Sequence, residues 1–139
     1  MMLEPGERTT TVEEQQTEIE RLLAKGNRTI FVAEHDGQLA GYLAALGGEF
    51  KRNKHSAHIV IGILQDFTGQ GIGTQLFLAL EDWAHRQHIH RLELTVMTHN
   101  KAGIALYQKR GFEIEGTKRH SMFVNGHYVD EYYMAKLLE

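Results

Sequence analysis

The residues best suited to chemistry begin with a glycine-rich stretch from Thr68 to Thr74. Its sequence, TGQGIGT, has glycines at 69, 71 and 73, between an apolar run and an apolar pattern of helical spacing. Because these glycines lack Cβ atoms, backbone N–H groups can approach a ligand closely. The first turn of a helix adds unpaired N–H donors and the positive end of its dipole. The stretch therefore predicts a cradle for an anion such as a pyrophosphate.

Two other ligand classes and one ligand-free interpretation are open for this stretch. A Walker-type phosphate loop ends in Gly-Lys-Ser or Gly-Lys-Thr, and the stretch contains no lysine. A dinucleotide fingerprint reads GxGxxG, whereas this stretch reads GxGxG. Glu93, 20 residues after Gly73, stands inside an expected strand rather than at its end. Dinucleotide binding is thus the second interpretation, and a glycine-rich connection without function is the third.

Glycine positions and apolar periodicity predict the surrounding elements. Gly26 ends a helix predicted over residues 11–25, and Asp36-Gly37 between two apolar runs predicts a hairpin. The later predicted elements are a strand over residues 55–64, a helix after Gly73, a strand over RLELTV, a helix over residues 100–110, and strands over residues 112–115 and 128–137.

This order has one strand–helix–strand unit inside a sheet otherwise built from hairpins. It favours an α+β fold with a mixed, mostly antiparallel sheet over a doubly wound fold. At 139 residues the chain is long enough for one domain, which we expect to span residues 1–139.

Composition excludes several classes of protein. The absence of cysteine excludes disulfides, thiolate metal sites and a cysteine nucleophile. The histidines at 85, 88 and 90 lack the HExxH pattern, so no metal is expected. A net charge of −3 with scattered cations argues against nucleic-acid binding. The chain has neither a signal peptide nor an apolar run of about 20 residues, so we expect no membrane association and a cytoplasmic location.

Residues from about 30 to 137 resemble the GNAT acetyltransferase superfamily through two motifs, 27 residues apart. The first, R/Q-x-x-G-x-G/A, corresponds to residues 68–73. The second, N-x-x-A-x-x-L-Y-x-x-x-G-F, is matched by Asn100, Leu106, Tyr107, Gly111 and Phe112, with Ala102 or Ala105 at its small position. The resemblance implies a central strand pair that splays apart, flanked by helices. It also implies a chain shortened at its start, without the family's first strand and helix.

The resemblance further implies that acetyl-CoA is the co-substrate. The backbone of Ile61 and Ile63 would pair with its pantetheine arm, and Asn100 would hydrogen-bond the same arm. The residues expected to hold the pyrophosphate are Gly69, Gln70, Gly71, Ile72, Gly73 and Thr74. Taken alone, Asn100 could equally be a helix N-cap.

Tyr107 is the implied catalytic residue, because a phenol can protonate the departing thiolate. Taken alone, it would instead be a tyrosine of the core. The attacking amine must first lose a proton. The glutamate that some relatives use corresponds to Thr95, which leaves Glu49 and His58 as candidate bases. A backbone N–H within residues 61–63 is the expected oxyanion donor.

The implied function is transfer of acetyl from acetyl-CoA to a primary amine by direct attack in a ternary complex. The acceptor could be a protein N-terminus, an amino acid, a polyamine or a similar amine. The alternative is an idle acyl-CoA-binding module, because the family's first strand and helix are not recognised and Thr95 stands where some relatives carry a glutamate; a nucleotide-binding protein is less favoured. Tyr132 and Tyr133, in the terminal strand, predict edge pairing in a homodimer.

Overall fold

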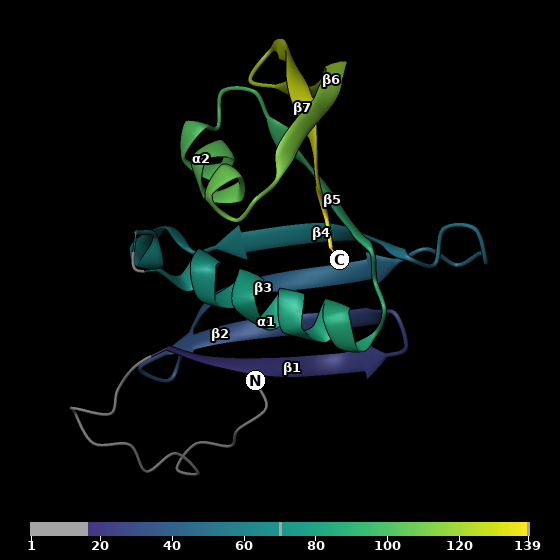
Figure 1. Ribbon diagram of the computed structural model, residues 1–139. Helices are drawn as coiled ribbons and strands as arrows, with labels where there is room; N and C mark the ends of the chain where they lie inside the picture. Colours follow the sequence, from purple (N-terminus) through teal and green to yellow (C-terminus); the bar gives the residue numbers. More distant parts are fainter. Residues whose placement is uncertain (1–16, 70, 139) are drawn as a thin grey trace.

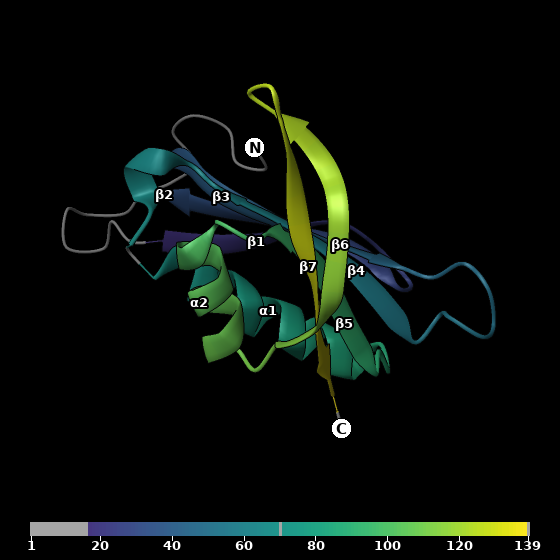
Figure 2. The same cartoon turned by 90° about the horizontal axis from the view of Figure 1, so that it is seen from above.

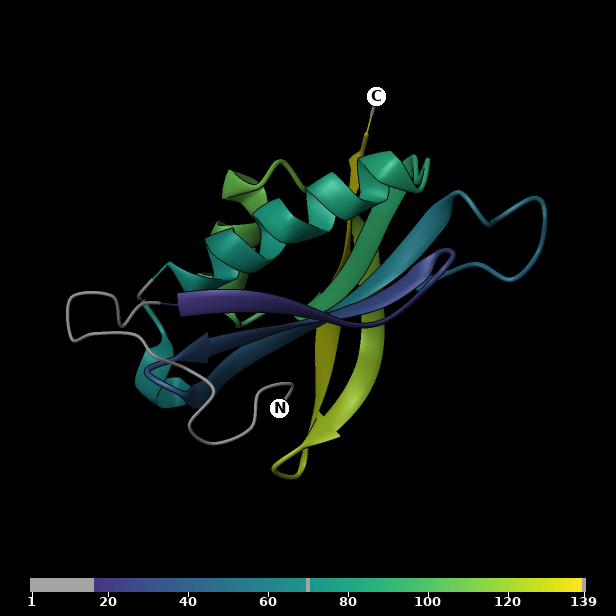
Figure 3. The same ribbon diagram turned by 90° about the horizontal axis from the view of Figure 1, so that it is seen from below.

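The computed structural model describes residues 17–69 and 71–138, which form a seven-stranded sheet with two α-helices on one face (Figures 1 and 3). The strand order is β1-β2-β3-β4-β5-β7-β6, and only the β4–β5 pair is parallel. In chain order the elements are β1 (Thr17–Lys25), β2 (Arg28–His35), β3 (Gln38–Gly47), β4 (Ser56–Ile63), the 3₁₀ turn η2 (Gln65–Phe67), α1 (Ile72–Arg86), β5 (Arg91–Met97), α2 (Lys101–Lys109), β6 (Glu113–Val124) and β7 (His127–Leu137).

The N-terminal edge of the sheet differs from the prediction. Residues 17–25 form strand β1, so the predicted helix over residues 11–25 is wrong for this part, and residues 11–16 lie outside the described residues. β1 pairs antiparallel with β2 through a turn at Gly26-Asn27, and the Asn27 side chain donates to the Gly48 carbonyl at 2.8 Å. Pairing with an existing sheet edge outweighs the helical propensity of the segment.

The hairpin, the following strand, both helices and the last strand are confirmed, with boundaries shifted by one or two residues. Asp36 and Gly37 have φ values of 52° and 80°, as a two-residue hairpin turn requires. β6 is much longer than the predicted strand over residues 112–115. The outer part of β6 projects from the sheet together with β7 (Figure 2), and its residues are mostly exposed on both faces. A strand exposed in this way needs no alternation of apolar and polar residues, which is the pattern that predicts a strand from sequence.

The centre of the sheet is split between β4 and β5. Their parallel ladder comprises only three rungs, from Ser56↔Arg91 to His58↔Glu93. Beyond it, β4 continues along β3 as far as Ile63, while β5 continues along β7 as far as Met97. The α+β fold with a splayed central strand pair is therefore confirmed.

The terminal strand β7 is not an edge strand. From Glu131 to Leu137 it pairs with β5 on one side, and from His127 to Ala135 it pairs with β6 on the other. The prediction of edge pairing through Tyr132 and Tyr133 is therefore wrong. Both of these residues lie in the doubly paired part, where the backbone groups are already used within the sheet.

Helix α1 packs its apolar stripe onto the sheet, with the buried side chains of Ile72, Leu76, Phe77, Leu80, Trp83 and Ala84. At the edge of this stripe, the mostly buried Glu81 carboxylate accepts a hydrogen bond from Arg110 Nη2 at 3.2 Å. It also accepts one from Lys136 Nζ. One carboxylate thus connects α1 to the end of α2 and to β7.

Replacing this carboxylate should destabilise the protein. Glu81→Gln is expected to lower the free energy of unfolding by about 1–3 kcal/mol, because two mostly buried cations lose their counter-charge. Denaturant unfolding followed by circular dichroism measures the change. The control Asp82→Asn, which removes an exposed partner of Arg86 on the same helix, should cost less than about 0.5 kcal/mol. Equal losses in the two variants would contradict the connecting role.

Candidate functional site

A mostly apolar cavity of about 510 Å³ lies where β4, α1 and α2 meet. Ile61 and Ile63 of β4 form one wall, and the glycine-rich stretch forms another. Because β4 has left β5 at this point, none of the described strands pairs with the β5-facing edge of residues 59–63. Of the predicted coenzyme-binding residues, those placed in this lining are Ile61, Ile63, Gly69, Gly71, Ile72, Gly73, Thr74 and Asn100. Gln70 lies outside the described residues.

The glycine-rich stretch presents the start of α1 to this cavity. Gly69 and Gly71 both have a φ of 78°, a conformation that glycine adopts without strain. Gly71 is the N-cap of α1, and no side chain of the described residues caps the helix. The first intrahelical hydrogen bond runs from Gln75 N to Gly71 O at 3.1 Å, so the N–H groups of residues 72–74 have no partner within the helix. This arrangement fits a phosphate group.

Gly73 serves a different purpose from the other two glycines. A Cβ atom at this position would lie 2.7 Å from Leu106 Cδ2 and 3.2 Å from Ile63 Cδ1. Gly73 therefore permits the first turn of α1 to pack closely against α2. Ile72 is only 1% exposed and packs in the core, so at this residue the backbone is the group offered to a ligand.

Asn100 has the capping role considered from the sequence. Its Oδ1 accepts a hydrogen bond from Gly103 N at 3.0 Å, at the start of α2. Asn100 also lines the apolar cavity, and its amide nitrogen makes no hydrogen bond to the described residues. The N-cap role therefore leaves the amide donor of this cavity-lining side chain available.

Tyr107 also lines this cavity and is 8% exposed. Its ring packs edge-on against Phe77, with centroids 5.8 Å apart, and is tilted against Phe112 at 6.3 Å. Burial raises the pKa of the Tyr107 phenol above its ordinary value of 10.0. The phenol is thus protonated at neutral pH and can donate a proton.

Two further cavities continue from the apolar cavity to the other face of the sheet. A notch of about 140 Å³ lies in the gap between β4 and β5 and includes Ile61, Tyr107, His58 and Thr95 in its lining. Ile61 and Tyr107 also line the apolar cavity. A polar cavity of about 550 Å³ on the opposite face shares His58 and Thr95 with the notch. The shared residues show that the three cavities adjoin one another through the sheet.

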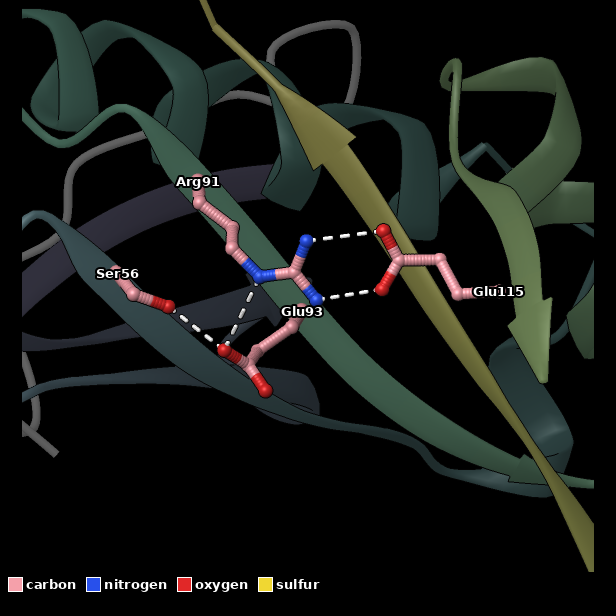
Figure 4. Close-up of polar contacts among 4 residues, drawn as sticks. All are labelled: Ser56, Arg91, Glu93 and Glu115. Atoms are coloured by element: carbon pink, nitrogen blue, oxygen red, sulfur yellow. Dashed lines mark hydrogen bonds and ion pairs between the residues drawn. The ribbon is translucent and has the colours of Figure 1, made fainter. Parts of the chain in front are cut away.

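A charged cluster that the sequence analysis did not assign lies in the polar cavity (Figure 4). Arg91 donates to both oxygens of Glu115, at 2.6 and 2.9 Å, and its Nε donates to Glu93 Oε1 at 3.4 Å. Ser56 Oγ donates to the same Glu93 oxygen at 2.6 Å. The hydrogen bonds with Glu115 raise the pKa of Arg91, and those from Arg91 lower the pKa of Glu115. These residues come from β4, β5 and β6, and no spacing along the chain relates them.

The two candidate bases are placed differently. His58 lines both the notch and the polar cavity. Glu49 lies in the loop after β3, where it is exposed and accepts a hydrogen bond from Arg28 at 3.1 Å. It lines none of the three cavities, so the structure does not bring Glu49 to the site. Thr68 lines the apolar cavity, and its hydroxyl donates to the Gln65 carbonyl at 2.9 Å, closing the η2 turn.

Within residues 17–69 and 71–138, no group of His, Asp or Glu side chains is arranged to hold a metal ion. No helix in the same residues is long and apolar enough to cross a membrane.

Comparison with known proteins gives consistent matches. The model of the acetyltransferase (GNAT) family matches residues 3–112. The chain is 34% identical over 122 residues to the L-amino acid N-acetyltransferase AaaT of Escherichia coli K12, covering 85% of this chain and 74% of that protein. It is 31% identical to the E. coli K12 spermidine N(1)-acetyltransferase, covering 70% of this chain but only 52% of the relative. A GNAT-family acetyltransferase structure from Streptococcus pneumoniae superimposes with a TM-score of 0.79 at 33% identity, covering 83% of this chain and 70% of that one.

The environment of Tyr107 leads to a testable pH dependence. Burial favours the protonated phenol, so the stability that this residue contributes below pH 10.0 should be lost as the pH rises through its higher folded pKa. The difference in phenolate absorbance between the wild-type protein and Tyr107→Phe should show one group titrating above pH 10.0. When the same difference is measured in denaturant, the titration midpoint should return to the ordinary value of 10.0. A native midpoint at or below that value would contradict the buried placement.

Proposed function

This chain belongs to the acetyltransferase (GNAT) family, and we therefore propose that it transfers an acetyl group from acetyl-CoA to a primary amine by direct attack in a ternary complex. The observation that carries the proposal is the opening through the sheet between β4 and β5. An apolar cavity beside a helix N-terminus adjoins it on one face, and a polar cavity adjoins it on the other. Both reactants can thus be bound at the same time, one on each face of the sheet, with their reacting groups meeting in the notch.

The coenzyme occupies the apolar cavity in this proposal. Backbone groups of Ile61 and Ile63, which β5 leaves unpaired, hydrogen-bond the pantetheine arm as a neighbouring strand would. The N–H groups at the start of α1 bind the pyrophosphate, with Gly69, Gln70 and Gly71 leading into them. The Asn100 amide donates to the arm. Bound in this way, acetyl-CoA supplies a thioester carbonyl as the electrophile.

The chemistry then depends on groups around the notch. The amine nitrogen bonds to the carbonyl carbon, the carbon–sulfur bond breaks, and the Tyr107 phenol protonates the departing sulfur. A backbone N–H within residues 61–63 stabilises the oxyanion. His58 faces the notch from the polar side and accepts the proton that the amine must lose. Thr95 gives the notch a neutral wall at the position where some relatives carry a glutamate.

The alternative function is to bind acyl-CoA without transferring the acyl group, and Thr95 is the residue that motivates it. Its hydroxyl cannot replace a carboxylate as a base at neutral pH. An idle acyl-CoA-binding module would bind the coenzyme and would acetylate none of a broad panel of amines.

Coenzyme binding is the first property to measure. Calorimetric titration with acetyl-CoA should give saturable binding with one site per chain, whereas NAD should give none, because the stretch lacks the GxGxxG spacing. The variant Gly71→Val should weaken acetyl-CoA binding, since a β-branched residue at a φ of 78° strains the loop. Absence of acetyl-CoA binding by the wild-type protein would refute the proposal, and saturable NAD binding would favour the dinucleotide interpretation.

Removing the Tyr107 hydroxyl separates binding from catalysis. Tyr107→Phe should reduce kcat by about 10²-fold or more, because a general acid contributes at least this factor. The Kd for acetyl-CoA should change little, since the ring and its packing remain. The control Tyr128→Phe removes an exposed phenol on the β6–β7 hairpin, outside all three cavities, and should leave kcat unchanged. Equal turnover in the wild-type protein and Tyr107→Phe would exclude the acid role.

A further inference from the structure

We propose that the acceptor is a free amino acid, whose amine lies beside Glu93 and whose carboxylate is bound by Lys118 in the polar cavity. This inference rests on the proposed function and narrows its acceptor to one chemical class. It follows from which charged groups of the cavity are already engaged and which are open to a ligand.

The polar cavity has two cations and two carboxylates in its lining. Arg91 and Glu115 neutralise each other through a two-point contact, in which both Glu115 oxygens and both terminal nitrogens of Arg91 take part. This pair is therefore closed to a ligand. Glu93 and Lys118 remain as the charged groups that can recognise one.

Glu93 offers one oxygen to the cavity. Its Oε1 accepts hydrogen bonds from Ser56 and Arg91, while Oε2 has no partner in the described part of the chain (Figure 4). Glu93 also forms the last rung of the β4–β5 ladder with His58, directly before the strands separate. A carboxylate oxygen at this place suits an ammonium group that must enter the notch.

Lys118 offers the opposite charge on the far side of the cavity. It is exposed, and its Nζ makes no hydrogen bond or ion pair with any described residue. Glu131, its register partner on β7, instead accepts a hydrogen bond from the Ser121 hydroxyl. Glu93 is level with Ala135 of β7 and Lys118 with Glu131, four residues further along, so the backbones that carry the two side chains lie about 16 Å apart at ordinary strand geometry. Two long side chains reaching across this width leave room for a small ligand between their charges.

An open carboxylate near the notch and an open ammonium farther out match a molecule with one amine and one carboxylate. A polyamine carries a second cation, which Lys118 would repel. A peptide N-terminus has a neutral amide in place of the adjacent carboxylate and gains nothing from Lys118. The charge arrangement therefore selects the free amino acid among the possible acceptors.

The experiment compares acceptors that differ only in the carboxylate. Each standard amino acid is assayed with acetyl-CoA beside its α-amide, together with spermidine and a tripeptide. A free amino acid should be the best acceptor, and its amide should lose about tenfold or more in kcat/KM, the scale of one charge-assisted contact. A best acceptor among the amides, spermidine or the tripeptide would overturn the inference while leaving the proposed function intact. Absence of acetyl-CoA binding would instead refute the proposed function.

Variants at Lys118 test the site itself. Lys118→Gln should raise KM for the best amino acid about tenfold and leave KM for its amide unchanged. Lys118→Arg should retain the preference for the carboxylate. The control Arg119→Gln removes the same charge from the next residue, which does not line the cavity, and should have no effect on the preference. An equal change of KM for the acid and the amide in Lys118→Gln would show that Lys118 does not bind the carboxylate.

Discussion

The rest of the structure depends on the separation of β4 from β5 after three shared rungs. Each strand is held by its other neighbour, β4 by a continuous antiparallel ladder to β3 and β5 by one to β7. Neither strand can therefore turn back to close the gap. The backbone groups along one side of β4 are left without strand partners at the centre of the sheet, and unpaired backbone groups are costly unless water or a ligand satisfies them. The opening through the sheet is a direct consequence.

Both helices start from the ends of the diverging strands, and this brings their N-termini to the same opening. α1 follows β4 through the glycine-rich stretch, while α2 follows β5 through Asn100. Contact between Gly73 and Leu106 holds the two helices together at the cavity, and Glu81 joins them to β7 on the other side of α1. The start of α1 is thus positioned by packing within the cavity wall, and the body of the helix by ion pairs away from the cavity.

The two faces of the opening have contrasting chemistry, as the proposed reaction between two different reactants requires. The helix face combines apolar walls with exposed N–H groups, which suits a long coenzyme with a phosphate end. The opposite face carries the charged cluster of Arg91, Glu93 and Glu115, with Lys118 at its margin. Tyr107 lines both the apolar cavity and the notch, so a protonated phenol lies where the two sides meet.

Local chemistry is what could be predicted from the sequence by itself. The α+β class, the Asp36-Gly37 turn, the glycine-rich stretch and the Asn100 cap follow from residues whose effects extend over one turn or one loop. The sequence alone did not predict strand β1, the length of β6 or the interior position of β7, because these depend on which sheet edge is free. The polar cavity is also decided by tertiary structure. Strand order brings Arg91, Glu93 and Lys118 to one face, whereas Glu49, equally plausible by residue type, is held away from it. Periodicity reports the burial of a segment, but only the order of strands in the sheet decides which charged side chains meet.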